Sequence, residues 1–324
     1  MAEQKVEFGN KTGGLQTVEL TFGQKLKDLW KSIKQHKLSY LFVAPYMILF
    51  ALFTIGPVLA AIYLSFTYFN VLGPPRWIGW TNYRLLFLED DIFLIAIKNT
   101  IVFAVISGPV GYIASFLLAW LINQLRRFRL ACTLAFYAPS MTSGVAMGVI
   151  WQYFFSGDRY GLVNNFLINM GVMREPFLWL QDVRTQMPVV ILVSLWMSMG
   201  AGFLAMLAGL QTVPDELYEA GAIDGIQSKF QEIWYITLPM MRPQLLFGAV
   251  MAVVNSFNVF GVAVALTGLP SPLYATHTIV AHLHDYAFIR YELGYACAIA
   301  MVLFVATFSL NRGLMKVFST RGDF

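Results

Sequence analysis

The sequence predicts an all-α integral membrane protein with six transmembrane helices, and three observations support this fold class. Hydrophobic residues make up 58% of the 324 residues, charged residues make up 12%, and the mean hydropathy is +0.63. Soluble globular chains contain about 45–50% apolar and about 25% charged residues, so this chain has too few polar groups to cover a surface that faces water. Long stretches without formal charge recur along the chain, and the alternating ten-residue pattern of a membrane-spanning strand is absent.

Six stretches without formal charge are the candidate spans. They cover residues 38–69, 99–122, 130–155, 187–210, part of 243–284, and 293–311. Each reaches or nearly reaches the about 20 residues that an α-helix needs to cross about 30 Å of hydrocarbon. The fifth span should end near Leu266, and the segment around Pro270 and Pro272 should form an extracytoplasmic loop or a partial re-entry.

The distribution of Lys and Arg predicts the orientation of these spans. With the N-terminus in the cytoplasm, the inside segments hold 15 of the 22 Lys and Arg residues, and the outside segments hold 7. The positive-inside rule then places both termini in the cytoplasm, which in a bacterial cell means insertion in the inner (plasma) membrane.

Three regions follow from these spans: a cytoplasmic segment 1–37, a membrane domain 38–317 and a cytoplasmic tail 318–324. In the first region, apolar residues recur at helical spacing among lysines, at Phe22, Leu26, Leu29, Trp30 and Ile33. This pattern predicts an amphipathic helix that lies on the membrane surface.

The loop at residues 211–243, between the fourth and fifth spans, differs from the rest of the chain. It contains five acidic residues, Asp215, Glu216, Glu219, Asp224 and Glu232. A cytoplasmic loop has no topological need for carboxylates, so we interpret them as part of a surface that faces another protein.

Local signals in this loop predict two short helices. Pro214 suits the first turn of one helix, and Gly225 can end that helix in a left-handed conformation. Ser228 and Gln231 have the spacing of a capping box at the start of the second helix, which the Leu238-Pro239 pair should stop.

The sequence of this loop resembles that of one known protein family. The run Glu219-Ala220-Gly221-Ala222-Ile223-Asp224-Gly225, followed by Ile236-Thr237-Leu238-Pro239, resembles the EAA loop of binding-protein-dependent ABC importer permeases. Further stretches resemble the carbohydrate-uptake branch of that family: Gly79-Trp80-Thr81-Asn82-Tyr83, Asn99-Thr100 and Tyr137-Ala138-Pro139-Ser140. The resemblance runs from about residue 38 to the end of the chain.

Two positions depart from the family pattern. Gly221 stands where a second alanine is usual, and ten residues (226–235) separate Gly225 from Ile236 where nine are usual. The glycine keeps the small side chain that close helix packing requires. The extra residue leaves the register of the second short helix open, and it is similar to a subgroup of permeases for plant or algal oligosaccharides, alginate among them.

The resemblance implies an ABC type I importer permease fold and places the chain as the first permease of the usual pair. Such a chain forms a translocation path for carbohydrate together with a second homologous permease, and it is not itself an enzyme. Two ATP-binding cassette ATPase subunits would hold ATP and Mg, an extracytoplasmic solute-binding protein would deliver the sugar, and this chain would bind no cofactor. The lack of a P-loop in the sequence agrees with a separate ATPase.

In this family the first short helix of the loop docks in a groove of the ATPase. The resemblance therefore implies a coupling role for Asp215, Glu216, Glu219, Ala220, Gly221, Asp224, Gly225, Leu238 and Pro239. Glu219 would pair with a basic residue of the ATPase, and the small residues would allow close approach. An isolated Glu-Ala-Gly triplet would be an ordinary connector, whereas Gly225 and Leu238-Pro239 at their spacing favour coupling.

Hydrogen-bonding and aromatic residues inside the spans are candidates for the substrate path. They are Trp196 and Ser198 in the fourth span and Asn255, Phe257 and Asn258 in the fifth. The alternative is that these groups only join helices, because side-chain hydrogen bonds between membrane helices contribute about 0.6 kcal/mol each.

Three histidines in the predicted outer loop, His277, His282 and His284, could make that loop cationic and favour an acidic sugar such as alginate. Asp285 and Glu292 offset the charge. No HExxH spacing accompanies these histidines, so a metal site is not expected.

Two other classes of protein remain as alternatives. An ion- or proton-coupled secondary transporter of a small solute comes second, although the first five predicted spans lack the Asp or Glu that proton-coupled carriers usually place there. A membrane enzyme comes third, because no catalytic constellation is recognisable.

Overall fold

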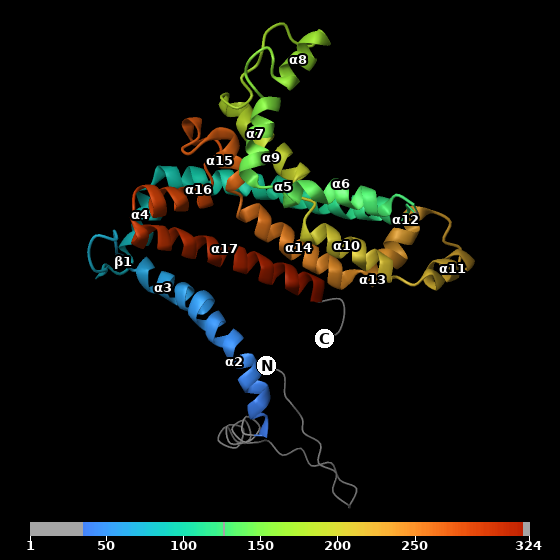
Figure 1. Cartoon of the computed structure of the whole chain (residues 1–324), viewed down its shortest axis with the longest axis horizontal. Helices are drawn as coiled ribbons and strands as arrows, with labels where there is room; N and C mark the ends of the chain where they lie inside the picture. Colours follow the sequence, from blue (N-terminus) through green and yellow to red (C-terminus); the bar gives the residue numbers. More distant parts are fainter. Residues whose placement is uncertain (1–34, 126, 320–324) are drawn as a thin grey trace, which may run out of the picture. The chain divides into compact units, whose positions relative to one another are not determined.

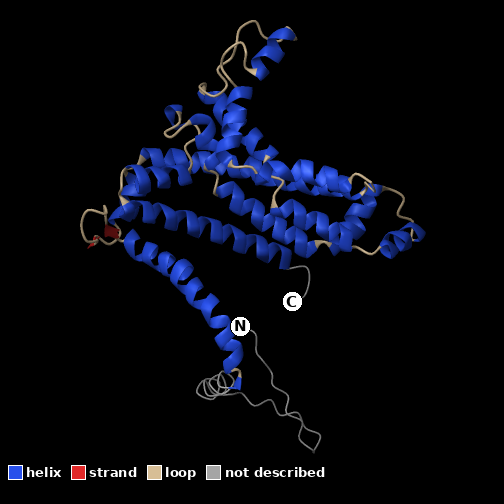
Figure 2. Cartoon of the chain, in the orientation of Figure 1, coloured by secondary structure: helices blue, strands red, loops and turns tan. Residues whose placement is uncertain are grey.

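The computed structural model describes residues 35–125 and 127–319 (Figure 1). The predicted surface helix around Leu26 and most of the 318–324 tail lie outside this part of the chain. Within it, nearly every element is a helix, and a two-stranded antiparallel ribbon pairs β1 (Thr67–Tyr68) with β2 (Arg76–Trp77) (Figure 2). This secondary structure confirms the predicted all-α class.

The first compact unit ends at Ala60. It contains α2 (Lys37–Phe50), the π-helix η1 (Ala51–Ile55) and the start of α3 (Gly56–Ser65). Pro57 accounts for the π-turn, because its ring has no N–H and crowds the carbonyl four residues earlier. The backbone widens instead, and the N–H of Gly56 bonds the carbonyl of Ala51.

The second unit, from Ala61 onward, carries the remaining spans. These are α5 (Asp91–Asn123), α9 (Val183–Trp196) with α10 (Ala201–Thr212), α14 (Arg242–Phe257) with α15 (Gly261–Thr267), and α17 (Leu293–Ser319). The described residues contain five helices or helix pairs that are long and apolar enough to cross a membrane. A sixth results if α6 (Arg129–Met141) and α7 (Gly144–Phe154), which meet at a bend of 100°, form one span.

Helix α5 packs against both α10 and α14. Small residues allow close approach along α5: a Cβ at Gly108 would lie 3.5 Å from Ser256 Oγ on α14, and one at Gly111 would lie 3.4 Å from Ser198 Oγ in the turn before α10. Lipid is as apolar as the helix surfaces, so close van der Waals packing between small residues is what holds membrane helices together.

Short helices lie at both ends of the bundle (Figure 1). One end has α11 (Asp215–Ile223), α12 (Lys229–Glu232), the π-helix η2 (Ile233–Thr237) and α13 (Leu238–Met240). The other end has α4 (Thr81–Leu88), the 3-10 turn η3 (Pro272–Tyr274), α16 (Ile279–His284) and the π-helix η4 (Asp285–Ile289).

The local signals of the 211–243 loop are largely confirmed. Gly225 follows α11 with φ of 94°, and Ser228 and Gln231 form the capping box of α12. The expected stop at Leu238-Pro239 is wrong, because the helix continues to Met240. The π-turn η2 comes directly before this pair and absorbs the missing N–H of Pro239, as η1 does before Pro57.

The long connection between α7 and α9 contains α8 (Leu162–Asn169) and is organised by one buried side chain. Asn164 is fully buried, and its Nδ2 donates to the carbonyls of Ser156, Asp158 and Phe177 at 3.0–3.1 Å. Its Oδ1 accepts from the backbone N–H of Phe177 and from Trp179 Nε1.

We predict that Asn164→Ala destabilises this connection by about 2–4 kcal/mol, because several buried donors and acceptors lose their partner together. Limited proteolysis of the purified protein should cut the connection in the variant and spare it in the wild type. The matched control is Asn165→Ala, whose side chain is exposed and should change the cleavage rate little. Equal cleavage of both variants would contradict this role.

Candidate functional site

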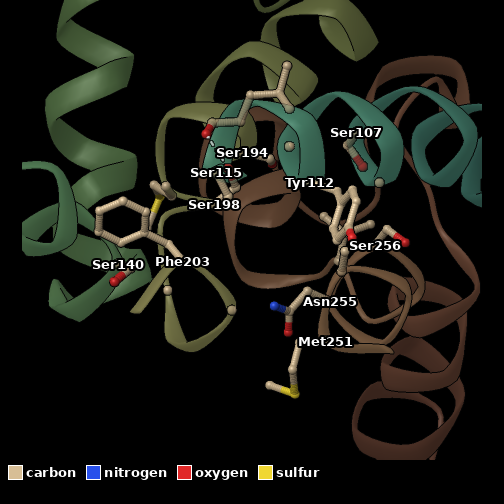
Figure 3. A pocket seen from close by; sticks show the side chains of 18 of the residues that line it. Ser107, Tyr112, Ser115, Ser140, Ser194, Ser198, Phe203, Met251, Asn255 and Ser256 are labelled. Carbon is tan, nitrogen blue, oxygen red and sulfur yellow. Dashed lines mark hydrogen bonds between the residues drawn. The ribbon is translucent and has the colours of Figure 1, made fainter. Parts of the chain in front are cut away.

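A cavity of about 470 Å³ lies between the helices of the second unit (Figure 3). Its wall is rich in hydroxyl and amide groups, and every residue lining it is uncharged. The polar lining residues are Ser107, Tyr112, Ser115, Tyr137, Ser140, Ser194, Ser198, Asn255, Ser256 and Asn258.

The cavity lies where the spans break. The gaps between α9 and α10, between α14 and α15, and between α6 and α7 each border residues of its wall: Ser198 and Gly200, Asn258 and Phe260, and Ser140 and Gly144. Non-helical backbone at membrane depth is tolerated only where protein buries it or where it lines a water-filled cavity. The broken spans therefore indicate an internal polar path at this point.

The predicted path residues divide into two groups. Ser198, Asn255 and Asn258 line the cavity, whereas Trp196 and Phe257 are not among its lining residues. Trp196 packs edge-on against Trp151 at 5.4 Å, and Phe257 packs on the hydrophobic cluster that contains Leu86 and Phe93.

The contribution of α5 to this wall was missed from the sequence. Ser107, Tyr112 and Ser115 all line the cavity. The signal was present in the Ser and Gly residues at 107, 108, 111 and 115, whose spacing of three to four residues places them on one helix face.

Four serines of the wall differ in their hydrogen bonding. Ser198 donates to the carbonyl of Leu195 at 2.7 Å and Ser256 to that of Val253 at 3.0 Å. The hydroxyls of Ser107 and Ser194 are buried and have no hydrogen-bond partner among the described residues. A buried hydroxyl without a partner costs about 1–3 kcal/mol, and a hydroxyl-bearing solute would recover this only after a movement that exposes these two oxygens.

The acidic residues of α11 form an exposed surface at one end of the bundle. Asp215, Glu216 and Glu219 are exposed, and so are Ala220 and Asp224. Gly221 is the exception, because it is buried, and a Cβ there would lie 2.8 Å from Ile236 Cδ1. The small residue at this position therefore serves packing of α11 against its own chain.

The structure places the histidines differently from the expected exposed loop. His277 and His282 are 2% and 1% exposed, and His284 stacks on Phe260 with ring centroids 4.7 Å apart. The imidazoles of His277 and His282 are therefore not available to a passing solute in this conformation. Among the described residues, no group of three or more potential metal ligands is present.

A partly buried carboxylate that the sequence did not reveal bonds His282, which in turn bonds His277. His282 Nε2 lies 3.0 Å from Asp90 Oδ2, which also accepts from the Tyr295 hydroxyl at 2.8 Å. Since a carboxylate only accepts, His282 donates through Nε2, and its Nδ1 accepts from His277 Nε2 at 3.2 Å in the neutral tautomer. Asp90 Oδ1 also caps α5 by accepting from the N–H of Phe93.

Burial and hydrogen bonding set the charge states of this cluster. Burial opposes ionisation of Asp90, but the hydrogen bonds from His282, the Phe93 N–H and Tyr295 outweigh it and hold the carboxyl pKa well below its usual range. Burial, together with the neighbouring His282, lowers the pKa of His277 to about 4. His277 is therefore a neutral ring at neutral pH.

We predict that the protein loses about 2 kcal/mol of unfolding free energy between pH 7 and pH 5 through His277. An unfolded histidine binds a proton below about pH 6.5, whereas the buried ring resists protonation down to about pH 4, so stability falls across that window. The charged groups around this ring are Asp90, Asp285 and Arg290, and His282 is the neighbouring titratable ring.

The test is the midpoint of thermal unfolding in detergent, measured from pH 7 to pH 5 for the wild type and His277→Gln. The glutamine keeps a donor toward His282 and does not titrate, so its unfolding midpoint should fall less over this range. Parallel pH profiles for the two proteins would rule out His277 as the source.

Comparisons with known proteins agree with this arrangement. Residues 107–318 match the family described as "Binding-protein-dependent transport system inner membrane component". The arabinooligosaccharides transport system permease protein AraP of Bacillus subtilis is 31% identical over 86% of this chain and 87% of the relative. The sulfoquinovosyl glycerol transport system permease protein SmoG of Agrobacterium fabrum is 28% identical over 90% of this chain and 94% of the relative.

A solved structure has the same fold. It is a chain of a bacterial ABC transporter involved in the import of the acidic polysaccharide alginate. The match has a TM-score of 0.77 and 25% sequence identity, and it covers 91% of this chain and all of the other.

Proposed function

This chain belongs to the family of binding-protein-dependent transport system inner membrane components, and we propose that it is a permease subunit of an ATP-driven importer of oligosaccharides. One observation carries the proposal: the broken spans converge on an uncharged, hydroxyl-lined cavity in a chain of this family. The carbohydrate relatives AraP and SmoG support the substrate class.

The working assembly that follows has four kinds of component. This chain is the first permease of a pair, a second homologous permease completes the path, two ATPase subunits hold ATP and Mg, and an extracytoplasmic binding protein delivers the sugar. The chain crosses the bacterial inner membrane six times with both termini in the cytoplasm, as the distribution of Lys and Arg predicts. The family gives no support to the alternative of an ion-coupled carrier.

The cavity wall suits sugar hydroxyls. Serine and asparagine side chains donate to and accept from hydroxyl groups, and their neutral wall offers an acidic sugar no counter-charge. Burying a carboxylate without a charged partner is costly. The solved structure belongs to an importer of an acidic polysaccharide, whereas the cavity wall of this chain carries no cationic group. An acidic sugar would therefore need cationic partners outside this wall.

The motion that powers transport would enter α14 at its N-terminal end, away from the cavity. Closure of the ATPases would move α11, which packs on η2, and η2 continues through α13 into α14. Because α14 contributes Asn255 and Ser256 to the cavity, a shift of α14 would change the cavity. Glu219, exposed on α11, is placed to pair with a basic residue of the ATPase.

We predict that Asn255→Leu and Ser198→Val each raise the KM for oligosaccharide uptake by about fivefold to tenfold, because each removes an oxygen that can accept a hydrogen bond of about 1 kcal/mol from a sugar hydroxyl. Uptake into proteoliposomes containing the complete importer gives the measurement. The control Thr307→Val removes a hydroxyl that bonds only within α17, to Leu303, and should leave the KM unchanged. Unchanged KM in both cavity variants would place the path elsewhere.

We predict that Glu219→Lys weakens association with the ATPase by more than tenfold, because loss of one member of a desolvated charge pair costs about 2–5 kcal/mol. The fraction of ATPase that co-purifies with this chain from membranes gives the measurement. The matched control is Glu175→Lys, an exposed carboxylate in the connection between α8 and α9. Full ATPase recovery with Glu219→Lys would remove the coupling role of this residue.

A further inference from the structure

The coupling loop contains a hydrogen bond that joins α11 to the helix behind it. Tyr218, in the middle of α11, places its hydroxyl oxygen 3.1 Å from Oγ1 of Thr237. Thr237 ends the π-turn η2 and is 1% exposed. Its hydroxyl also lies 3.2 Å from the carbonyl of Glu232, to which it donates. Since Thr237 has one hydroxyl proton, Tyr218 is the donor in the bond between them.

A second contact lies beside this bond. Tyr218 and Gly221 are three residues apart on α11 and therefore share one face of that helix. A Cβ at Gly221 would lie 2.8 Å from Ile236, the neighbour of Thr237, so no larger residue fits without displacement. The π-turn thus presents two successive residues, Ile236 and Thr237, to a single face of α11.

The hydrogen bonds continue from Thr237 to the cavity. The carbonyl of Thr237 accepts from the N–H of Met241, and the carbonyl of Met241 accepts from the N–H of Leu245 at the start of α14. The carbonyl of Leu245 in turn lies 3.2 Å from the Tyr112 hydroxyl, which donates to it from the cavity wall on α5. Met241 is fully buried, and Leu245 is 6% exposed.

We propose that Tyr218 and Thr237 are positioning residues for energy coupling: their hydrogen bond makes α11 and the adjacent end of α14 move as one body. This inference rests on the proposed function, in which α11 receives the motion of an ATPase. Without the bond, α11 would still dock, but its displacement would be lost by sliding over η2, because the remaining contacts around Gly221 and the Tyr218 ring are apolar. Rigid transmission of this kind requires a packed, hydrogen-bonded joint.

The test uses the complete importer in proteoliposomes. The substrate is a labelled oligosaccharide bound to the solute-binding protein, and this loaded binding protein is one that stimulates the ATPase of the wild-type importer. The variants are Tyr218→Phe, Thr237→Val, the double variant and Thr237→Ser. We expect each of the first two to lower the number of sugars imported per ATP hydrolysed by about threefold to tenfold, the effect of one hydrogen bond. The double variant should be no worse than either single variant, because both changes break the same bond.

Two further variants distinguish a positioning role of the hydrogen bond from a general loss of protein stability. Thr237→Ser keeps the hydroxyl and should restore the wild-type ratio. Tyr235→Phe is the matched control, because Tyr235 is 67% exposed on the same π-turn, and it should leave the ratio unchanged. Losses that add in the double variant, or a wild-type ratio in both single variants, would overturn the proposal. If the wild-type chain retains no ATPase at all, the proposed function has failed instead.

Discussion

The backbone hydrogen-bond requirement of a membrane interior determines where this chain can be irregular. Hydrocarbon offers no partner to a free N–H or C=O group, so a spanning helix can break only beside protein or water. Here the break between α9 and α10 and the break between α14 and α15 border one cavity, and its wall carries hydroxyls and amides. This constraint determines the position of the cavity and the polarity of its wall. The close helix contacts at the glycines in that wall depend on it as well.

Proline imposes a related constraint at the end of the bundle that carries α11. Pro239 has no backbone N–H, and the preceding helix widens to the π-turn η2 instead of ending. That turn places Ile236 and Thr237 against α11. A local backbone adjustment thereby connects a surface helix to a span that lines the cavity.

Asp90 has the corresponding role at the opposite end. It caps α5 through Phe93 and accepts hydrogen bonds from His282 and Tyr295, so one carboxylate joins three helices. Four acceptor sites on one ionised group make such a junction possible, and burial makes it expensive to break.

Periodicity and composition predicted the helical membrane fold, the two short helices of the 211–243 loop and the capping box at Ser228, because these are set by residues near one another in sequence. The burial of His282 could not be predicted in this way, because its partner Asp90 is 192 positions distant. The share of α5 in the cavity was overlooked for a different reason: small residues such as Gly108 were visible, but their neighbours on other helices were not.

In the proposed transport cycle, ATP hydrolysis by a partner drives oligosaccharide through this chain. The most direct measurement is uptake of labelled oligosaccharide by liposomes that contain the chain with its co-purified partners. We expect uptake only when ATP reaches the ATPase side and a sugar-loaded binding protein is present on the other side. Uptake by the purified chain alone, driven by a proton or sodium gradient without ATP, would contradict it.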